Sequence, residues 1–419
     1  MKVVRSELLK DLLLETKDGE WGKGGPTEGH DKMLVIRGAD FEDVRFGCFE
    51  SVPTRYIPSK KAEKKRLQHF DILIETAGGT VGRPTGRVIL IQDRHLKSVN
   101  LPVTCASFCR FMRPDQSKVY PPYLYWYLTY LYHSGQMDQY QVQHTGVARF
   151  QYTYFAQNIR IPLLSLEVQK KISHVLLTLD KKIELNRRMN ETLEQMAMAL
   201  YKYWFVDFGP FQDGEFMESE IGPIPINWEL RSLYSLANYI NGMAFKQRDL
   251  NDQKEGLPVI KISELNADSP KSAKYYAGPY QDKYFLNTGD VLFSWSATLD
   301  IYLWSHGPAL LNQHIFNVKS NGSFSKSTLY FILKSVINEF KEIAASRATT
   351  MGHIKKEHLE EKLIPYPPAE VRVKIESQFA NYFDLMLSNL LEINTLAETR
   401  DYLLPRLLSG EIEVREAEE

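Results

Sequence analysis

The stretch Ile161-Pro162-Leu163-Leu164-Ser165-Leu166-Glu167-Val168 decides the fold, because a related stretch returns 203 residues later as Ile364-Pro365-Tyr366-Pro367-Pro368-Ala369-Glu370-Val371. In each copy proline interrupts the preceding structure, and glutamate sits in the first helical turn, where the helix dipole favours a negative charge. A long apolar pattern with alternating spacings of four and three residues follows each copy, which is the heptad pattern of a coiled coil. The repeat therefore predicts two long helices that pack antiparallel on each other.

The two apolar seams keep the same 203-residue offset along their whole length. Asn186 corresponds to Asn389, and a polar residue on such a seam costs stability but can fix the register of the pair. The plainer alternative is that both helices are core helices of a bundle. The predicted seam residues are Ile172, Leu176, Leu179, Ile183, Asn186, Leu193 and Leu200 in the first helix, and Ile375, Phe379, Met386, Asn389, Leu396 and Leu403 in the second, where Arg400 is a charged exception.

The segments before the two helices also resemble each other, although their offsets drift from 223 to 203 residues. Short runs of Val, Ile, Thr and aromatic residues between Gly, Pro and Asn turns predict strands there. The fold class is therefore α+β: two globular domains joined by two long antiparallel coiled-coil helices, with a pseudo-two-fold internal repeat. The matching segments are Leu13–Gly19 with Leu236–Gly242, both interpreted as a helical end followed by a turn, Ile36–Asp40 with Ile260–Glu264, and Phe70–Ile74 with Gly289–Phe293. The predicted divisions are a first globular domain at 1–160, a central helical region at 161–208, a second globular domain at 209–363 and a C-terminal helical region at 364–419.

The composition describes an ordinary globular protein whose charges are unevenly spread. The 419 residues are 43% hydrophobic and 25% charged, and the formal net charge is −1. Residues 51–160 carry 15 Lys and Arg against 6 Asp and Glu, whereas residues 361–419 carry 6 against 12. This asymmetry indicates an anionic partner for the N-terminal part.

Several features of the sequence predict a cytoplasmic protein. The three cysteines, Cys48, Cys105 and Cys109, cannot form a disulfide framework, and we interpret them as structural thiols. The first residues lack the apolar core of a signal peptide, and no apolar run approaches the ~18 residues that a membrane span needs. No membrane association is predicted.

The motifs of the common enzyme classes are absent from the sequence. There is no phosphate-binding GxxxxGK[ST] loop, no GxGxxG, no HExxH and no GxSxG. Tyr120-Pro121-Pro122-Tyr123 resembles the motif of amino-methyltransferases, but tyrosine cannot supply the carbonyl acceptor of its first position, and a helix start explains the prolines better. We therefore predict no catalytic residues, no cofactor and no metal site.

Basic, aromatic and amide side chains remain as candidate DNA-binding residues. The cationic run at 60–66 would neutralise phosphates, or it is simply a solvated helix face. The Gly-rich loop at 77–87 would bring arginine forks to guanine, or it is an ordinary hairpin loop. The segments at 145–152 and 349–356 occupy equivalent places before the two helices. The candidates are Lys60, Lys61, Lys64, Lys65, Arg66, Thr76, Arg83, Arg87, Arg149, Gln151 and Tyr152 in the first domain, and Lys246, Lys261, Ser294, Trp295, Ser296, His353, Lys355 and Lys356 in the second.

Two helix-end segments carry a family likeness. Trp204-Phe205-Val206-Asp207-Phe208 and Arg400–Ile412 resemble the helical regions of type I restriction-modification DNA specificity subunits. Ile224–Glu229 is similar to the opening of a target-recognition domain in that family, an opening that the first domain lacks. The likeness extends over essentially the whole chain.

The resemblance implies a non-catalytic subunit whose two target-recognition domains each read half of a bipartite, asymmetric sequence in double-stranded DNA. The paired helices would fix the spacer between the half-sites, and two modification (adenine methyltransferase) subunits and restriction/translocase subunits would assemble around the chain. The rival interpretation is a coiled-coil scaffold with two protein-binding domains. The sequence does not give the recognised bases, the spacer length, the base-contacting loops, the stoichiometry or the presence of a restriction subunit.

Overall fold

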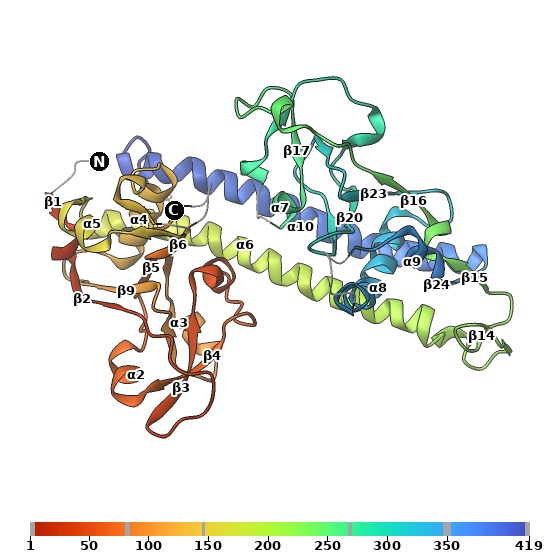
Figure 1. Ribbon diagram of the computed structural model, residues 1–419, viewed down its shortest axis with the longest axis horizontal. Coiled ribbons are helices and arrows are strands. Elements are labelled where there is room, and N and C mark those ends of the chain that lie inside the picture. Colours follow the sequence, from red (N-terminus) through yellow and green to blue (C-terminus); the bar gives the residue numbers. More distant parts are fainter. Residues whose placement is uncertain (1–4, 80–83, 145–146, 267–269, 347–352, 415–419) are drawn as a thin grey trace, which may run out of the picture. The chain divides into compact units, whose positions relative to one another are not determined.

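A computed structural model describes residues 5–79, 84–144, 147–266, 270–346 and 353–414 (Figure 1). Its contacts divide the chain into two compact units. Unit 1 comprises Met1–Glu184 and Leu396–Glu419, and unit 2 comprises Leu185–Thr395. The long helices α6 (Leu166–Tyr201) and α10 (Ala369–Ser409) each contribute one part to each unit. Both helices begin where the repeated stretch predicts.

Unit 1 is built on a four-stranded antiparallel sheet in the order β2-β9-β5-β7. A second sheet, β4-β3-β8, combines an antiparallel pair with a parallel pair, and β10-β11-β6 and β1-β12 are smaller sheets. The strands are β1 (Arg5–Leu8), β2 (Leu13–Asp18), β3 (His30–Ile36), β4 (Thr54–Pro58), β5 (Ile72–Glu75), β6 (Ala77–Gly79), β7 (Val88–Leu90), β8 (Val103–Cys105), β9 (Cys109–Pro114), β10 (Gln141–His144), β11 (Val147–Phe150) and β12 (Arg160–Leu163). The short helices are α1 (Phe41–Arg45), α2 (Ser59–Lys65), α3 (Asp93–Lys97), α4 (Pro121–His133) and α5 (Tyr152–Asn158).

Unit 2 repeats this plan with its own sheets. Its antiparallel sheet has the order β16-β23-β20-β21, and its mixed sheet has the order β18-β17-β22-β19. Two-stranded sheets β15-β24 and β13-β14 complete the unit. The strands are β13 (Phe216–Met217), β14 (Ile224–Pro225), β15 (Glu229–Ser232), β16 (Ala237–Asn241), β17 (Leu257–Ile260), β18 (Tyr275–Tyr276), β19 (Phe285–Leu286), β20 (Val291–Ser294), β21 (Asp300–Leu303), β22 (Ala309–Leu311), β23 (Ile315–Ser320) and β24 (Leu363–Tyr366). Besides α6 and α10, the α-helices are the short α7 (Ile262–Leu265) and α9 (Lys356–Glu361) and the longer α8 (Lys326–Ser346).

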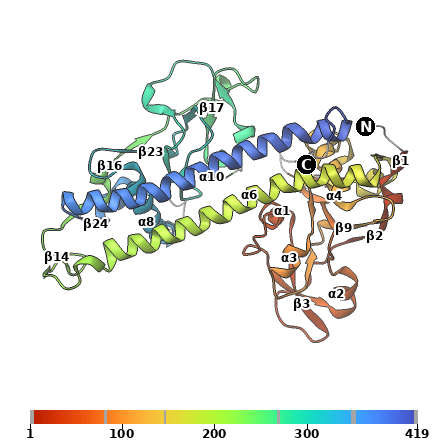
Figure 2. The ribbon, with the colours of Figure 1, turned by 180° about the vertical axis from the view of Figure 1, so that it is seen from behind.

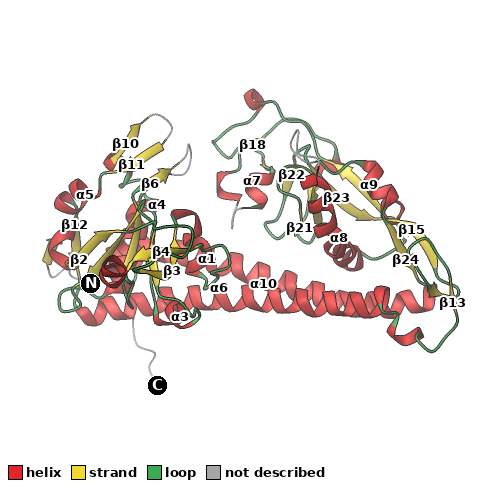
Figure 3. Cartoon of the chain, turned by 60° about the horizontal axis from the view of Figure 1, so that its bottom comes forward, coloured by secondary structure: helices red, strands yellow, loops and turns green. Residues whose placement is uncertain are grey.

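The match between the two units confirms the predicted internal repeat and the α+β class. The sheet orders correspond strand by strand, from β2-β9-β5-β7 to β16-β23-β20-β21 and from β1-β12 to β15-β24. Helix α4 packs against β7 in one unit. In the other, α8 packs against β21, as Figure 3 shows. The two prolines that resemble a methyltransferase motif occupy the first turn of α4, as a helix start requires.

One expectation about the repeated segments is wrong. Only Leu236 ends a helical turn; the rest of both segments is not helical, because the chain runs as the extended strands β2 and β16 up to Asp18 and Asn241. The glycine that follows each strand lies against a carbonyl oxygen of the mixed sheet. A Cβ would stand 2.1 Å from the oxygen of Cys105 at Gly19, and 2.2 Å from the oxygen of Asn312 at Gly242. Close backbone approach, and not a turn, therefore explains why both positions are glycine.

Each unit closes its apolar core with both long helices. In unit 1 the core around Trp126 of α4 includes Ile172 and Leu176 of α6 together with Leu404 and Leu407 of α10. In unit 2 the core around Phe331 of α8 takes its side chains from later residues of α6 and earlier residues of α10. Each core therefore depends on helices from both halves of the sequence. None of the described long helices is apolar enough to cross a membrane.

The two helices pair antiparallel within each unit. In unit 2 the Asn389 side-chain amide donates to Oδ1 of Asn190 at 2.8 Å, and Asn190 donates to the Met386 carbonyl at 3.1 Å. In unit 1 the pairing partners are Asp180 of α6 and Arg400 of α10. Figure 2 shows both helices from behind. Every predicted seam residue is buried or half-buried: Ile172, Leu176, Leu179, Ile183, Asn186, Leu193 and Leu200 on α6, and Ile375, Phe379, Met386, Asn389, Leu396 and Leu403 on α10.

The charged seam residue Arg400 has a buried partner. Its Nη1 lies 2.9 Å from Oδ1 of Asp180, whose other oxygen accepts from Nη2 of Arg45 on α1 at 2.7 Å. The carboxylate side chain is 7% exposed and thus bridges two arginines inside unit 1. By the 203-residue offset, the corresponding positions in unit 2 are Phe383 and Ala197, and both are buried and apolar. The repeat is therefore chemically asymmetric at this level of the helix pair.

Candidate nucleic-acid interface

An open hollow of unit 1 brings together three of the predicted DNA-binding residues, Thr76, Gln151 and Tyr152. It has a volume of about 540 Å³ and lies where β2 ends, β9 begins and β11 passes into α5. The Phe150 amide donates to the Thr76 carbonyl at 2.9 Å, which ties the segment before α5 to the end of β5. Segments far apart in sequence therefore meet around this hollow.

Arg110 is the cation of this hollow, and sequence reasoning missed it. It faces Asp18 across the β2–β9 pair, and its Nε and Nη2 donate to the two carboxylate oxygens at 2.9 and 2.8 Å. Its guanidinium carbon stands 4.5 Å from the centre of the Tyr152 ring. Burial raises the pKa of Tyr152, so this ring stays a neutral phenol at ordinary pH. Only the cross-strand register of β2 and β9, which a single sequence does not reveal, could have identified this pair.

The corresponding position in unit 2 is aromatic. Trp295 follows β20 as Thr76 follows β5, and its carbonyl accepts from the Ile354 amide at 2.9 Å, as the Thr76 carbonyl accepts from Phe150. The indole Nε1 donates to Oδ1 of Asn241 at 3.2 Å, and the Trp295 ring centre lies 5.8 Å from that of Phe316. The β2–β9 and β16–β23 registers match Asn241 to Asp18 and Phe316 to Arg110. The same place in the repeated fold thus carries an ion pair in one unit and an aromatic cluster in the other.

Two histidines complete the aromatic cluster of unit 2. The ring centre of His353, a predicted DNA-binding residue, lies 5.8 Å from that of Trp295, and the His314 ring lies 5.5 Å from it. His353 is held there by a β-bridge to Ser296. Ser294 and Ser296 are buried, and the Ser294 hydroxyl donates to the Ser296 carbonyl at 3.2 Å. We therefore assign the two serines to the support of this loop and keep Trp295 and His353 as its presented side chains.

The cationic run of unit 1 is divided between internal and outward roles. Lys61 and Lys65 on α2 both pair with Glu20, at 3.1 and 3.0 Å. Burial would raise the pKa of Glu20, but the two lysines outweigh it and lower that pKa. Lys60, Lys64 and Arg66 are exposed. These three remain suited to phosphate contacts.

The remaining predicted residues differ in how far they are exposed. Arg149, Lys246 and Lys355 are exposed, and Lys261 is half-buried. Lys356 is exposed too, but it pairs with Glu360 at 2.8 Å and lies 4.6 Å from the Tyr234 ring. Arg83 falls outside the described residues.

Arg87 does not fit the role of a base-reading residue. Its Nε and Nη2 donate to the Glu75 carboxylate at 3.0 Å each, and Nη2 also donates to the Gly38 carbonyl. The Arg87 side chain is 19% exposed, and that of Glu75 is 3% exposed. The fork that a guanine would need is therefore occupied inside the domain. The expectation that Arg87 reads a base is therefore wrong, and Arg87 stabilises unit 1 instead.

Replacement of Arg87 by alanine is expected to lower stability without relaxing sequence choice. Loss of hydrogen bonds to a buried carboxylate should cost about 1.5–3 kcal/mol. Urea unfolding of the purified chain would measure this change. Methylation by the assembled complex should fall equally on all DNA sequences, and a selective gain on one altered half-site would contradict the structural role.

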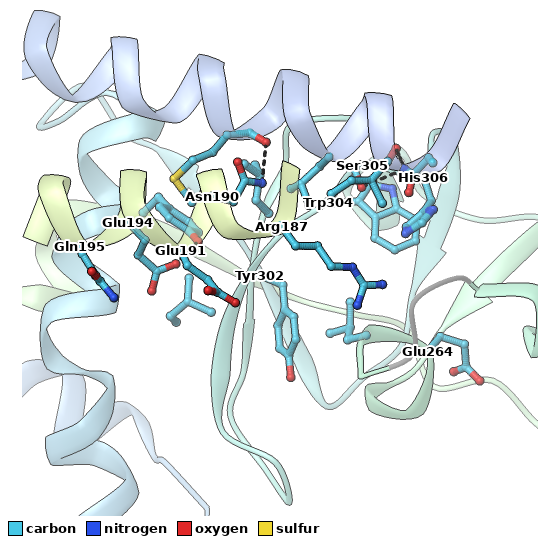
Figure 4. Close-up of a pocket in the computed structure, with 18 of the residues that line it drawn as sticks. Arg187, Asn190, Glu191, Glu194, Gln195, Glu264, Tyr302, Trp304, Ser305 and His306 are labelled. Carbon is cyan, nitrogen blue, oxygen red and sulfur yellow. Dashed lines mark hydrogen bonds between the residues drawn. The ribbon is translucent and has the colours of Figure 1, made fainter. Parts of the chain in front are cut away.

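A second hollow, in unit 2, lies between the long helices and β21. It has a volume of about 750 Å³. Figure 4 shows Arg187, Glu191 and Glu194 of α6 beside Tyr302 of β21. Asn394 of α10 also lines this hollow, and its side-chain amide donates to the carbonyl of Ser305 at 2.9 Å. None of the predicted DNA-binding side chains lines this hollow, so we do not assign it to DNA contact. Among the described residues, no group of three or more His, Cys, Asp or Glu side chains could hold a metal ion.

Comparisons with known proteins agree with this duplicated plan. Residues 38–195 and 225–395 match the family model of the type I restriction modification DNA specificity domain. The chain is 27% identical over 308 residues to the type I restriction enzyme MjaIX specificity subunit of Methanocaldococcus jannaschii, covering 69% of each protein. It is 26% identical over 310 residues to the HindI specificity subunit of Haemophilus influenzae, covering 59% of this chain and 67% of that protein.

A solved structure supports the fold as well. The S subunit of the type I restriction-modification system from M. genitalium superimposes with a TM-score of 0.50 at 15% identity, covering 99% of this chain and 96% of that one. At this identity the likeness concerns the fold alone.

Proposed function

We propose, from the premise that this chain belongs to the family of type I restriction-modification DNA specificity subunits, that its two domains read different halves of a bipartite, asymmetric DNA sequence. The chain is a specificity subunit, which recognises the DNA target and is itself non-catalytic. The coiled-coil scaffold with two protein-binding domains is set aside, because the family models span most of both globular domains.

One observation carries the proposal of two different half-sites. The same fold position holds Asp18 and Arg110 in unit 1, but Asn241, Phe316 and Trp295 in unit 2. A guanidinium presents hydrogen-bond donors, whereas an aromatic cluster presents rings that contact the thymine methyl group or stack. Two such different surfaces on one duplicated scaffold favour two different half-sites.

The domain plan follows from the same repeat. We propose target-recognition domains at residues 1–160 and 209–363, and helical spacer regions at 161–208 and 364–419. Helices α6 and α10 run unbroken across the unit boundaries at Glu184/Leu185 and Thr395/Leu396. We propose that their length sets the spacer between the half-sites.

The proposed protein partners are two modification subunits, together with restriction subunits. We also propose that this chain acts in the cytoplasm. Helix α6 supports the proposal of protein partners with a face that points away from the seam. Leu185, Met189 and Met196 of α6 and Tyr203, two residues beyond its end, recur at spacings of four and seven residues and are 41–52% exposed. Apolar side chains aligned on one exposed face are typical of an interaction surface. Helix α6 also carries six cations: Lys170, Lys171, Lys181, Lys182, Arg187 and Arg188. Arg187 lines the hollow beside β21, and we propose that the other five add polar contacts to the partner subunits.

Methylome sequencing tests the proposal directly. A methylation-free host carrying this chain with its modification subunit should show one methylated motif made of two half-sites separated by unspecified bases. A host that carries the modification subunit alone is the control and should lack the motif. No new methylation, or a single uninterrupted motif, would count against two-domain recognition.

A further inference from the structure

We infer that Arg110 reads a guanine in the half-site of the first domain, held in place by Asp18 and Tyr152. This inference rests on the proposed function and adds one contact to it. The bidentate pairing with Asp18 uses Nε and one hydrogen of Nη2. Arg110 makes no further hydrogen bond to the residues that the structure describes, and toward these residues the Nη1–Nη2 end of the fork is open. That end has the geometry to donate to O6 and N7 of guanine in the major groove.

The surroundings of Arg110 restrict its motion. Its side chain is 20% exposed, the Tyr152 ring lies under the guanidinium, and the Asp18 carboxylate fixes the plane of the fork. An arginine ordered before binding loses little conformational freedom when it meets a base. Pre-ordering therefore favours a directional contact with a base edge.

The charge balance favours a base over a phosphate. Asp18 offsets the charge of Arg110 one to one, so the pair gains little from the general attraction to the DNA backbone. Exposed lysines such as Lys60 and Lys64 on α2 are better suited to that attraction. Arg110 therefore contributes directional hydrogen bonds and little net charge, and directional hydrogen bonds to base edges are what distinguish one base from another.

Arg113, on the same strand, shows what a purely internal arginine looks like in this sheet. It pairs in the same bidentate way with Asp71, but Nη1 also donates to Glu15 at 2.7 Å and Asp71 is fully buried. Its fork has partners on both edges, whereas that of Arg110 borders an open hollow. Arg113 is therefore the matched control.

The experiment uses the complex of this chain with its modification subunit, and duplexes that carry the wild-type motif or a single base-pair change in it. Arg110→Ala should reduce the preference for one G·C pair of one half-site by about 5- to 150-fold, and should leave the other half-site unchanged. Arg110→Lys should lose the same preference, because lysine keeps the charge but lacks the fork. Arg113→Lys should change thermal stability and leave every base preference intact.

Three results would overturn the inference. One is a wild-type motif with no G·C pair in the half-site that Arg110→Ala affects. Another is an equal loss on all duplexes. The third is an Arg110→Lys complex that behaves as wild type, which would assign Arg110 to phosphate. A bipartite wild-type motif in any of these cases leaves the proposed function standing, so the two failures are distinguishable.

Discussion

Replacement of Asp180 by alanine is expected to lower the free energy of unfolding by about 3–5 kcal/mol. The carboxylate joins Arg45 of the globular part of unit 1 to Arg400 of α10, and the exposed fractions of the two arginine side chains are 17% and 13%. Removal of Asp180 leaves two buried cations without their shared partner. Removing one partner of a buried ion pair lowers stability by more than the intact pair contributes to it, because the remaining charge is left buried without either a counter-charge or water.

Chemical denaturation of the purified chain, followed by a fluorescence signal of the tryptophans, would measure this loss. Asp401→Ala is the matched control, since Asp401 also pairs with Arg400, at 2.8 Å, but is 32% exposed. A partly exposed pair should contribute at most about 1 kcal/mol. If the two substitutions lowered the free energy of unfolding equally, burial of Asp180 would not explain the contribution of this cluster to stability.

The same cluster predicts how the variant depends on pH. Burial would raise the pKa of Asp180, but Arg45 and Arg400 outweigh it and lower that pKa below its ordinary value of 3.8. A carboxylate with a lowered folded-state pKa stabilises the protein above its unfolded-state pKa, and this contribution is lost as pH falls through the folded-state pKa. The stability difference between wild type and Asp180→Ala should therefore be full at neutral pH and should narrow below about pH 4.

Lengthening both long helices is expected to change the accepted spacer and to leave both half-sites unchanged. Seven residues inserted between Glu184 and Leu185, and seven between Thr395 and Leu396, preserve the heptad seam. The two points are matched, because the Asp180–Arg400 and Asn190–Asn389 contacts bracket both of them. Each insertion adds about 10.5 Å of helix, which corresponds to about three base pairs of DNA.

Methylation of a duplex library with every spacer length would measure the effect. The wild-type spacer should lose methylation almost completely, and a longer one should gain it. Insertion into α6 alone is the control, because it shifts one seam against the other and should abolish methylation at all spacers. Unchanged spacer preference in the doubly lengthened protein would exclude the helices as the ruler.

The two long helices could be predicted because the pattern that marks them, the spacing of apolar residues, lies within each segment itself. A heptad needs only the chain's own spacing, so α6 and α10 begin where the repeated Ile-Pro stretch places them. The sequence predicts a helical end at Leu13–Asp18, which forms strand β2 instead. This segment has no clear two-residue alternation, and it owes its conformation to pairing with β9, almost a hundred residues away.

The sequence predicts which segments contribute to the candidate site, but not which charged side chains are available in it. Thr76, Gln151 and Tyr152 do share one hollow, because each follows a strand end that the pattern marks. The two arginines are different. The Gly-rich segment around Arg87 predicts an available side chain, but Glu75 holds it inside the domain. The sequence around Arg110 gives no sign of a site, yet this residue lines the hollow. Partner choice between charges depends on tertiary register, which the order of residues alone does not give.

The asymmetric seam also limits what half of the chain could do alone. If two copies of residues 1–208 associated through α6 as the whole chain does through α6 and α10, Asp180 of each copy would face Ala197 and lose its cross-helix arginine. Two copies of the second half would set Arg400 against Phe383. In either homodimer the buried charge would lose the partner that it has across the helix pair, and this loss would occur twice; only Arg45 would remain to Asp180, and only Asp401 to Arg400. The Asp180–Arg400 pair thus favours pairing of the first half of the chain with the second half over pairing of either half with its own copy, as complementary charges favour heterodimers over homodimers.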